Sequence, residues 1–162
     1  EGTFINYALK NEHIFITRTF SKLFSMAGCR LGYVVGWSDG INMVQKLCTP
    51  HNTNAFALKF AESILESPTI LNDLIEKFKE GRRYLLKTLD ANGYSHKGEA
   101  GNFLFIKTKT DAPTIVSRMK HEKRILIKSY PNVGDFGTCL RVSIGEKHYM
   151  QQFIEALLEL DK

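Results

Sequence analysis

The spacing of hydrophobic positions changes twice along this chain. Short runs of β-branched and aromatic residues at 13–17 and 30–36 predict two buried strands. From 54 to 67 the apolar residues recur every three or four positions, which predicts a helix. A second helix begins at Ser67-Pro68, since serine is a favoured cap and proline a favoured first helical residue, and Asn92-Gly93 ends it. Two strands are therefore followed by a long helical segment.

Beyond this segment, strand patterns and helix patterns alternate. Alternating strands and helices indicate a layered α/β domain. No internal repeat or low-complexity stretch interrupts them. The strands are expected over 102–107, 125–128 and 139–144, and the helices over 111–123 and 146–160.

A break in the pattern at Thr49-Pro50-His51-Asn52 separates the first strands from the helices. Proline and asparagine favour turns, so a boundary near this point is expected. We accordingly predict a first part over 1–50, a helical connector over 51–93 and a small C-terminal α/β domain over 94–162.

Composition and charge are those of an ordinary soluble globular protein. The 162 residues are 43% hydrophobic and 24% charged, a balance that can bury a core. The net charge of +5 is spread along the chain, and the mild cluster over 120–128 lacks interleaved aromatic residues. No apolar run reaches the roughly 20 residues needed to cross a bilayer. We therefore expect neither nucleic acid nor membrane as a partner.

The cysteines and histidines show no metal-ligand spacing. An odd number of widely spaced cysteines implies no disulfide framework and favours a reducing cytoplasm. We expect no metal, and a cytoplasmic protein. The cysteines are Cys29, Cys48 and Cys139, and the histidines are His13, His51, His96, His121 and His148.

One segment carries a chemical signature. It reads Arg18-Thr19-Phe20-Ser21-Lys22 and continues as Ala27-Gly28-Cys29-Arg30-Leu31-Gly32. A lysine can form a Schiff base with an aldehyde cofactor, while hydroxyls and an arginine can bind the phosphate of that cofactor. Taken alone, Lys22 would be an exposed loop lysine, and the two hydroxyls could serve ordinary turn chemistry. Cys29 is interpreted as a small packing residue.

With these residues the chain resembles the pyridoxal-phosphate enzymes of the aminotransferase superfamily, fold type I. The motif is similar to Thr-x-Ser-Lys-x(4)-Ala-Gly-x-Arg-x-Gly of class I/II enzymes, and most similar to the histidinol-phosphate aminotransferase branch. The resemblance implies an α/β fold made of the end of the large cofactor-binding domain and the small C-terminal domain. It also implies that Lys22 forms the Schiff base and moves a proton, and that Thr19, Ser21 and Arg30 bind the phosphate of pyridoxal 5'-phosphate.

Two further motifs resemble the small domain of this family. Gly101-Asn102-Phe103 is similar to its Asn-Phe pair, which implies that Asn102 faces the substrate, although a strand-end asparagine can also satisfy backbone groups. Leu140-Arg141-Val142-Ser143-Ile144-Gly145 is similar to Leu-Arg-x-Ser-x-Gly, which implies that Arg141 binds the anionic group of the substrate. Lys128 stands where the histidinol-phosphate branch often has arginine. It keeps the charge but not the bidentate fork, which weakens the expectation of a phosphorylated substrate.

The resemblance covers nearly the whole chain and follows the order of the second half of such an enzyme. The family's aspartate for the pyridine nitrogen is absent, so it lies upstream or Glu1 takes its place. The glycine-rich turn, the stacking aromatic residue and the asparagine of the first half are also absent. We therefore expect a fragment that is inactive alone, and a complete enzyme that is a homodimer.

The implied activity is transfer of an amino group between an amino acid, or an amino-alcohol phosphate such as histidinol phosphate, and a 2-oxo acid. The expected partners are therefore small-molecule amino and oxo acids. A related lyase such as a threonine-phosphate decarboxylase would use the same lysine and phosphate contacts. A non-catalytic α/β module without the cofactor is the third possibility.

Overall fold

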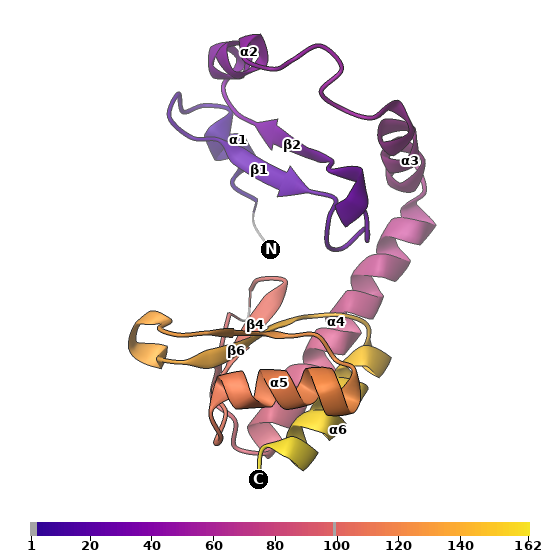
Figure 1. The fold of residues 1–162 in the computed structure, drawn as a ribbon. Helices are drawn as coiled ribbons and strands as arrows, with labels where there is room; N and C mark the ends of the chain where they lie inside the picture. The colour runs from indigo at the N-terminus through magenta and orange to yellow at the C-terminus, as the bar shows by residue number, and fades with distance from the viewer. Residues whose placement is uncertain (1–2, 99) are drawn as a thin grey trace. The chain divides into compact units, whose positions relative to one another are not determined.

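The computed structural model of the chain describes residues 3–98 and 100–162, drawn as a ribbon in Figure 1. The chain divides into two compact units that meet, in sequence, between Leu74 and Ile75. The long helix α4 (Pro68–Ala91) runs across this boundary. No helix within the described residues is both long and apolar enough to cross a membrane.

The first unit is built on a pair of antiparallel strands, β1 and β2, which Figure 1 shows side by side. The register pairs Thr19 with Gly32, so the chain between them forms a closed loop. Three residues of this loop, Phe20, Met26 and Leu31, pack with two residues of α3 in a small core. The elements are α1 (Ile5–Ala8), β1 (Ile16–Thr19), the 3-10 turn η1 (Ala27–Cys29), β2 (Gly32–Val35), α2 (Ser38–Lys46) and α3 (Ala55–Leu65).

The prediction that these two strands are buried is wrong. Their side chains are exposed or half-buried in every position. A two-stranded sheet cannot bury its own faces, and strands need a layer packed on them to exclude water. Apolar side chains such as Phe15, directly before β1, and Tyr33 in β2 are consequently exposed, at 41% and 49%.

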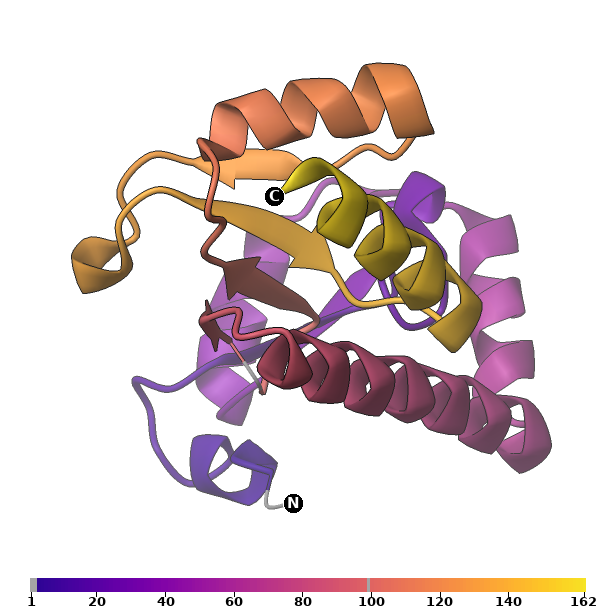
Figure 2. The ribbon, with the colours of Figure 1, turned by 90° about the horizontal axis from the view of Figure 1, so that it is seen from below.

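The second unit is a four-stranded antiparallel sheet in the order β3-β4-β6-β5. The helices α5 and α6 lie on one face of this sheet, as Figure 2 shows from below. The elements are β3 (His96–Lys97), β4 (Phe103–Ile106), α5 (Ala112–Lys123), β5 (Lys128–Tyr130), the 3-10 turn η2 (Gly134–Phe136), β6 (Cys139–Ser143) and α6 (Lys147–Leu160).

The core of the second unit lies between the sheet and its helices. Alternate residues of β4 and β6 point into it, because side chains in a strand alternate between the two faces. Leu104, Ile106, Leu140 and Val142 are almost fully buried there. The helix α4 completes the layer with Leu85 and Leu89. The other residues of β4 and β6, among them Phe103 and Arg141, therefore lie on the opposite face.

The strand predicted at 125–128 is displaced toward the C-terminus, since β5 begins only at Lys128. Arg124 adopts the left-handed conformation at the end of α5, with a φ of 57°. The Ile125 amide then donates to the Met119 carbonyl at 3.0 Å. Residues 125–127 connect the end of α5 to β5, which pairs with β6. Ile125 and Ile127 pack on the core.

A buried carboxylate ties the end of α6 to the loop that joins β4 to α5. Asp161 is only 1% exposed and accepts hydrogen bonds from the backbone amides of Lys109 (3.0 Å) and Thr110 (2.6 Å). Burial alone would raise the pKa of Asp161, but these hydrogen bonds outweigh it and lower the pKa. The charged carboxylate is therefore the form that stabilises this unit.

We expect Asp161→Asn to lower the free energy of unfolding by about 2 kcal/mol at neutral pH, because the hydrogen bonds lose a charged acceptor. Since the folded-state pKa is depressed, the stabilisation is present above the unfolded pKa of about 3.9 and disappears as pH falls through the folded value. Urea unfolding at several pH values measures this. Glu155→Gln, an exposed change on the same helix, is the control. Equal stability of Asp161→Asn and wild type at neutral pH would contradict this role.

Candidate functional site

The loop between β1 and β2 places the first group of predicted site residues. The Phe20 amide donates to the Leu31 carbonyl at 3.1 Å, and the Met26 amide donates to the Phe20 carbonyl at 3.1 Å. The three side chains are buried at 3% to 7% exposure. Ser21 and Arg30 each adjoin one end of the Phe20–Leu31 bond, so the fold brings residues nine positions apart to the same end of the hairpin.

Two hydroxyl groups lie together at the start of this loop. The Thr19 hydroxyl donates to Ser21 Oγ at 2.9 Å and accepts from the Ser21 amide at 3.1 Å. Thr19 is exposed and Ser21 half-buried. Each oxygen retains lone pairs, and the Ser21 O–H is free to donate to a further acceptor. The pair can therefore bind an anion such as a phosphate.

Lys22 follows directly and is exposed. Its carbonyl accepts from the Ser25 amide at 2.9 Å, and Ser25 has a positive φ of 54°. Beside it the Phe24 ring lies 4.9 Å from the Phe20 ring. The backbone around Lys22 is thus fixed by neighbours on both sides, while no partner of its ammonium group occurs within 3–98 and 100–162.

Arg30 closes the loop in the left-handed conformation, with φ of 52°. Its Nη1 donates to the Ala27 carbonyl at 3.1 Å, and the rest of the exposed guanidinium is available to an anion. Gly32 follows at a close approach of the two strands, since a Cβ there would lie 2.7 Å from the Arg18 carbonyl oxygen. The glycine at this position of the motif is therefore required by the hairpin itself.

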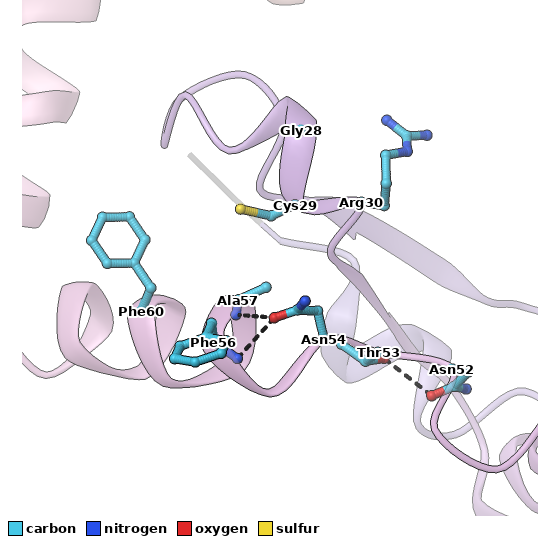
Figure 3. A pocket seen from close by; sticks show the side chains of 9 residues that line it. All are labelled: Gly28, Cys29, Arg30, Asn52, Thr53, Asn54, Phe56, Ala57 and Phe60. Carbon is cyan, nitrogen blue, oxygen red and sulfur yellow. Dashed lines mark hydrogen bonds between the residues drawn. The ribbon is translucent and has the colours of Figure 1, made fainter.

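A pocket of about 710 Å³ lies between this turn and the start of α3. In Figure 3 the Cys29 sulfur points toward α3, whereas the Arg30 side chain extends away from it. Asn54 caps α3, and its Oδ1 accepts from the amides of Phe56 (2.9 Å) and Ala57 (3.2 Å). The lining residues are Gly28, Cys29, Arg30, Asn52, Thr53, Asn54, Phe56, Ala57 and Phe60.

The residues that α3 and the loop before it contribute to this pocket were not among the predicted site residues. The break at Pro50-His51-Asn52 was interpreted only as a boundary. The signal available was the Asn52-Thr53-Asn54 run ahead of two phenylalanines one helical turn apart. Cys29 is half-buried and packs against the small core, as its interpretation as a packing residue required.

The second group of predicted site residues lies on the sheet of the second unit. Arg141, in β6, is directly opposite Phe105 on one side and Lys128 on the other. Directly opposite residues share a face, so two cations stand side by side on the face without helices. No carboxylate pairs with Arg141 among the residues that the structure describes. Like charges placed in this way favour an anionic ligand.

Asn102 lies at the start of β4, where its carbonyl accepts from the Ile144 amide at 3.0 Å. This bond uses the backbone and leaves the half-buried side-chain amide for other partners. The structure thus places Asn102 directly before β4, the strand that pairs with the Arg141 strand β6. It places Thr19, Ser21, Lys22 and Arg30 in the first unit, at the end of the hairpin of β1 and β2. Glu1 lies outside the described residues.

The residues of the first group fit a phosphorylated aldehyde such as pyridoxal 5'-phosphate. They comprise one exposed primary amine, a bonded pair of hydroxyls and a guanidinium with free N–H groups. Phosphate is bound by such donors, and the amine is the group that condenses with an aldehyde. Within the described part of the chain, no cluster of three His, Cys, Asp or Glu could hold a metal ion.

The family model for aminotransferase class I and II matches residues 5–157. The chain belongs to this family. Its fold is fold type I of the pyridoxal-phosphate-dependent transferases, shared with a histidinol-phosphate aminotransferase from Sinorhizobium meliloti solved in complex with pyridoxal-5'-phosphate. That structure has a TM-score of 0.83 and 23% sequence identity, and the match covers 96% of this chain and 43% of that one.

Two other proteins are similar to this chain, one in sequence and one in structure. A histidinol-phosphate aminotransferase from Geobacter sp. (strain M21) is 28% identical over 160 residues, covering 99% of this chain and 45% of the relative. The L-threonine-O-3-phosphate decarboxylase from Porphyromonas gingivalis has a TM-score of 0.70 at 22% identity, covering 96% of this chain and 49% of its own. This member of the class I and II aminotransferases thus spans about half the length of the relatives it matches.

Proposed function

We propose that this chain forms the second half of a pyridoxal-phosphate-dependent aminotransferase. The observation that carries the proposal is the Thr19–Ser21 hydroxyl pair held beside Lys22 and Arg30 at the end of one hairpin. When bound, pyridoxal 5'-phosphate supplies an aldehyde that forms a Schiff base with an amine and an electron sink for carbanion chemistry. We use "assembled enzyme" for this chain together with the rest of the family fold.

In the assembled enzyme each residue of the hairpin loop has a separate task. The Ser21 hydroxyl and the Arg30 guanidinium hold the phosphate, and Thr19 orients Ser21 through their 2.9 Å hydrogen bond. Lys22 supplies the amine and, once free, carries a proton to and from the substrate carbon. Because Phe20, Met26 and Leu31 anchor the loop in the small core, these groups are positioned before any ligand arrives.

The substrate is proposed to be an amino acid, or an amino-alcohol phosphate such as histidinol phosphate, with a 2-oxo acid as the amino acceptor. Arg141 binds its anionic group, and Asn102 lies directly before the neighbouring strand β4. Support comes from the cations Arg141 and Lys128, which lie side by side on one face of the sheet and have no carboxylate partner among the described residues. The three free cysteines support the proposed cytoplasmic setting. The proposed protein partner of the assembled enzyme is a second copy of itself.

Product analysis of the assembled enzyme tests this function. With an amino-acid or amino-alcohol phosphate donor and 2-oxoglutarate, we expect an amino group to appear on the oxo acid without release of carbon dioxide. Carbon dioxide in step with substrate loss would favour a decarboxylase, and absence of cofactor binding would favour a non-catalytic module. The 162-residue chain assayed alone is the control. It should show no turnover, because catalysis needs the full set of preorganised groups.

A further inference from the structure

The guanidinium of Arg141 stacks on an aromatic ring. Its Cζ lies 4.1 Å from the centroid of the Phe103 ring. The strand register pairs Arg141 directly with Phe105, so Phe103 is the diagonal neighbour on the same face. A planar guanidinium that stacks on a ring covers one of its flat sides and keeps the N–H groups of its edge for a carboxylate or phosphate.

Phe103 is itself held from two directions. Its ring meets the Phe105 ring edge to face at 5.2 Å, and Phe105 meets Tyr130 in the same way at 5.9 Å. Ahead of the strand, Arg82 of α4 donates a hydrogen bond to the Gly101 carbonyl, which fixes the entry into β4. The ring under Arg141 is therefore part of an ordered aromatic row.

We propose that Phe103 is a positioning residue that orients Arg141 for the anionic group of the substrate. The proposal rests on the function proposed above for Arg141. An arginine side chain has several rotatable bonds that must be ordered when it binds, and a stack that orders them in the free protein makes binding tighter. Phe103 acts only through Arg141 and touches no reacting atom.

A role in the core does not account for Phe103. The residue is half-buried on the face without helices, and the core on the other face is filled by its neighbours Leu104 and Ile106. Shortening Phe103 should therefore leave the packing of the second unit in place, so its effect on Arg141 can be measured separately.

Steady-state kinetics of the assembled enzyme provide the test. We expect Phe103→Leu to raise KM for the anionic donor roughly 2- to 30-fold, the range of a cation–π contact, with kcat and the absorbance of the bound cofactor unchanged. Phe103→Tyr keeps the π face and should retain the wild-type KM. In an Arg141→Ala background, Phe103→Leu should have no further effect, because the interaction it removes is already absent.

Two outcomes separate this inference from the proposed function. If Arg141→Ala raises KM while Phe103→Leu does not, the positioning role is overturned and the role of Arg141 stands. If Arg141→Ala leaves KM unchanged, both are overturned.

NMR of the 162-residue chain tests the stack without an activity assay. The ring should shift the Arg141 Nε–H resonance upfield. Phe103→Tyr should retain that shift, and Phe103→Leu should lose it. An unshifted resonance in the wild-type chain would also refute the stack.

Discussion

Replacing Lys22 with alanine should lower kcat of the assembled enzyme by at least about a thousand-fold, because the change removes both the amine that condenses with the aldehyde and the proton carrier. Cofactor affinity should fall less, since Ser21 and Arg30 still bind the phosphate. Stopped assays of amino transfer with the purified Lys22→Ala enzyme measure the loss. Borohydride reduction of the wild-type holoenzyme, followed by peptide mapping, should place the pyridoxyl group on Lys22.

The matched control is Lys46→Ala, which removes another exposed lysine of the same unit from the last turn of α2. It should retain wild-type turnover. A small primary amine added to Lys22→Ala should restore part of the activity, because the shortened side chain leaves room for it. Pyridoxyl labelling at Lys10, Lys46 or Lys59 would refute the assignment of Lys22.

The sequence predicted the helices of the second unit closely because their signals are local. The cap at Asp111, the apolar stripe of α6 and the Asn92-Gly93 stop each act within a few residues, and α5, α6 and the end of α4 appear where these signals lie. The start of β5 could not be obtained in this way. It depends on the left-handed turn at Arg124 and on where β6 offers a free edge.

The candidate site was predictable only in part. The Ser21-Lys22 to Arg30 motif identifies residues whose chemistry is specific, but its bonding depends on a register between strands that are distant in sequence. The stack of Arg141 on Phe103 likewise requires a diagonal neighbour across two strands. An apolar strand pattern indicates that a strand can be buried, but it does not show whether another layer packs on that strand. The predicted burial of β1 and β2 was wrong for this reason.

Replacing Arg141 and replacing Arg30 should have different effects on the assembled enzyme. For Arg141→Ala we expect kcat/KM for the anionic donor to fall by roughly two orders of magnitude or more, in keeping with loss of a charged hydrogen-bonded pair. The absorbance of the bound cofactor should stay intact, because Arg141 lies on the sheet of the second unit and the hairpin loop is unchanged.

Arg30→Ala should instead weaken cofactor binding, since it removes the guanidinium beside the hydroxyl pair, while saturating cofactor should restore much of the turnover. Titration of each variant with pyridoxal 5'-phosphate, followed by kinetics at saturating cofactor, separates the two effects. Thermal unfolding of both variants controls for loss of structure. Release of the cofactor by Arg141→Ala with KM for the donor unchanged would reverse the assignment, and the paired cations of β5 and β6 would then require another ligand.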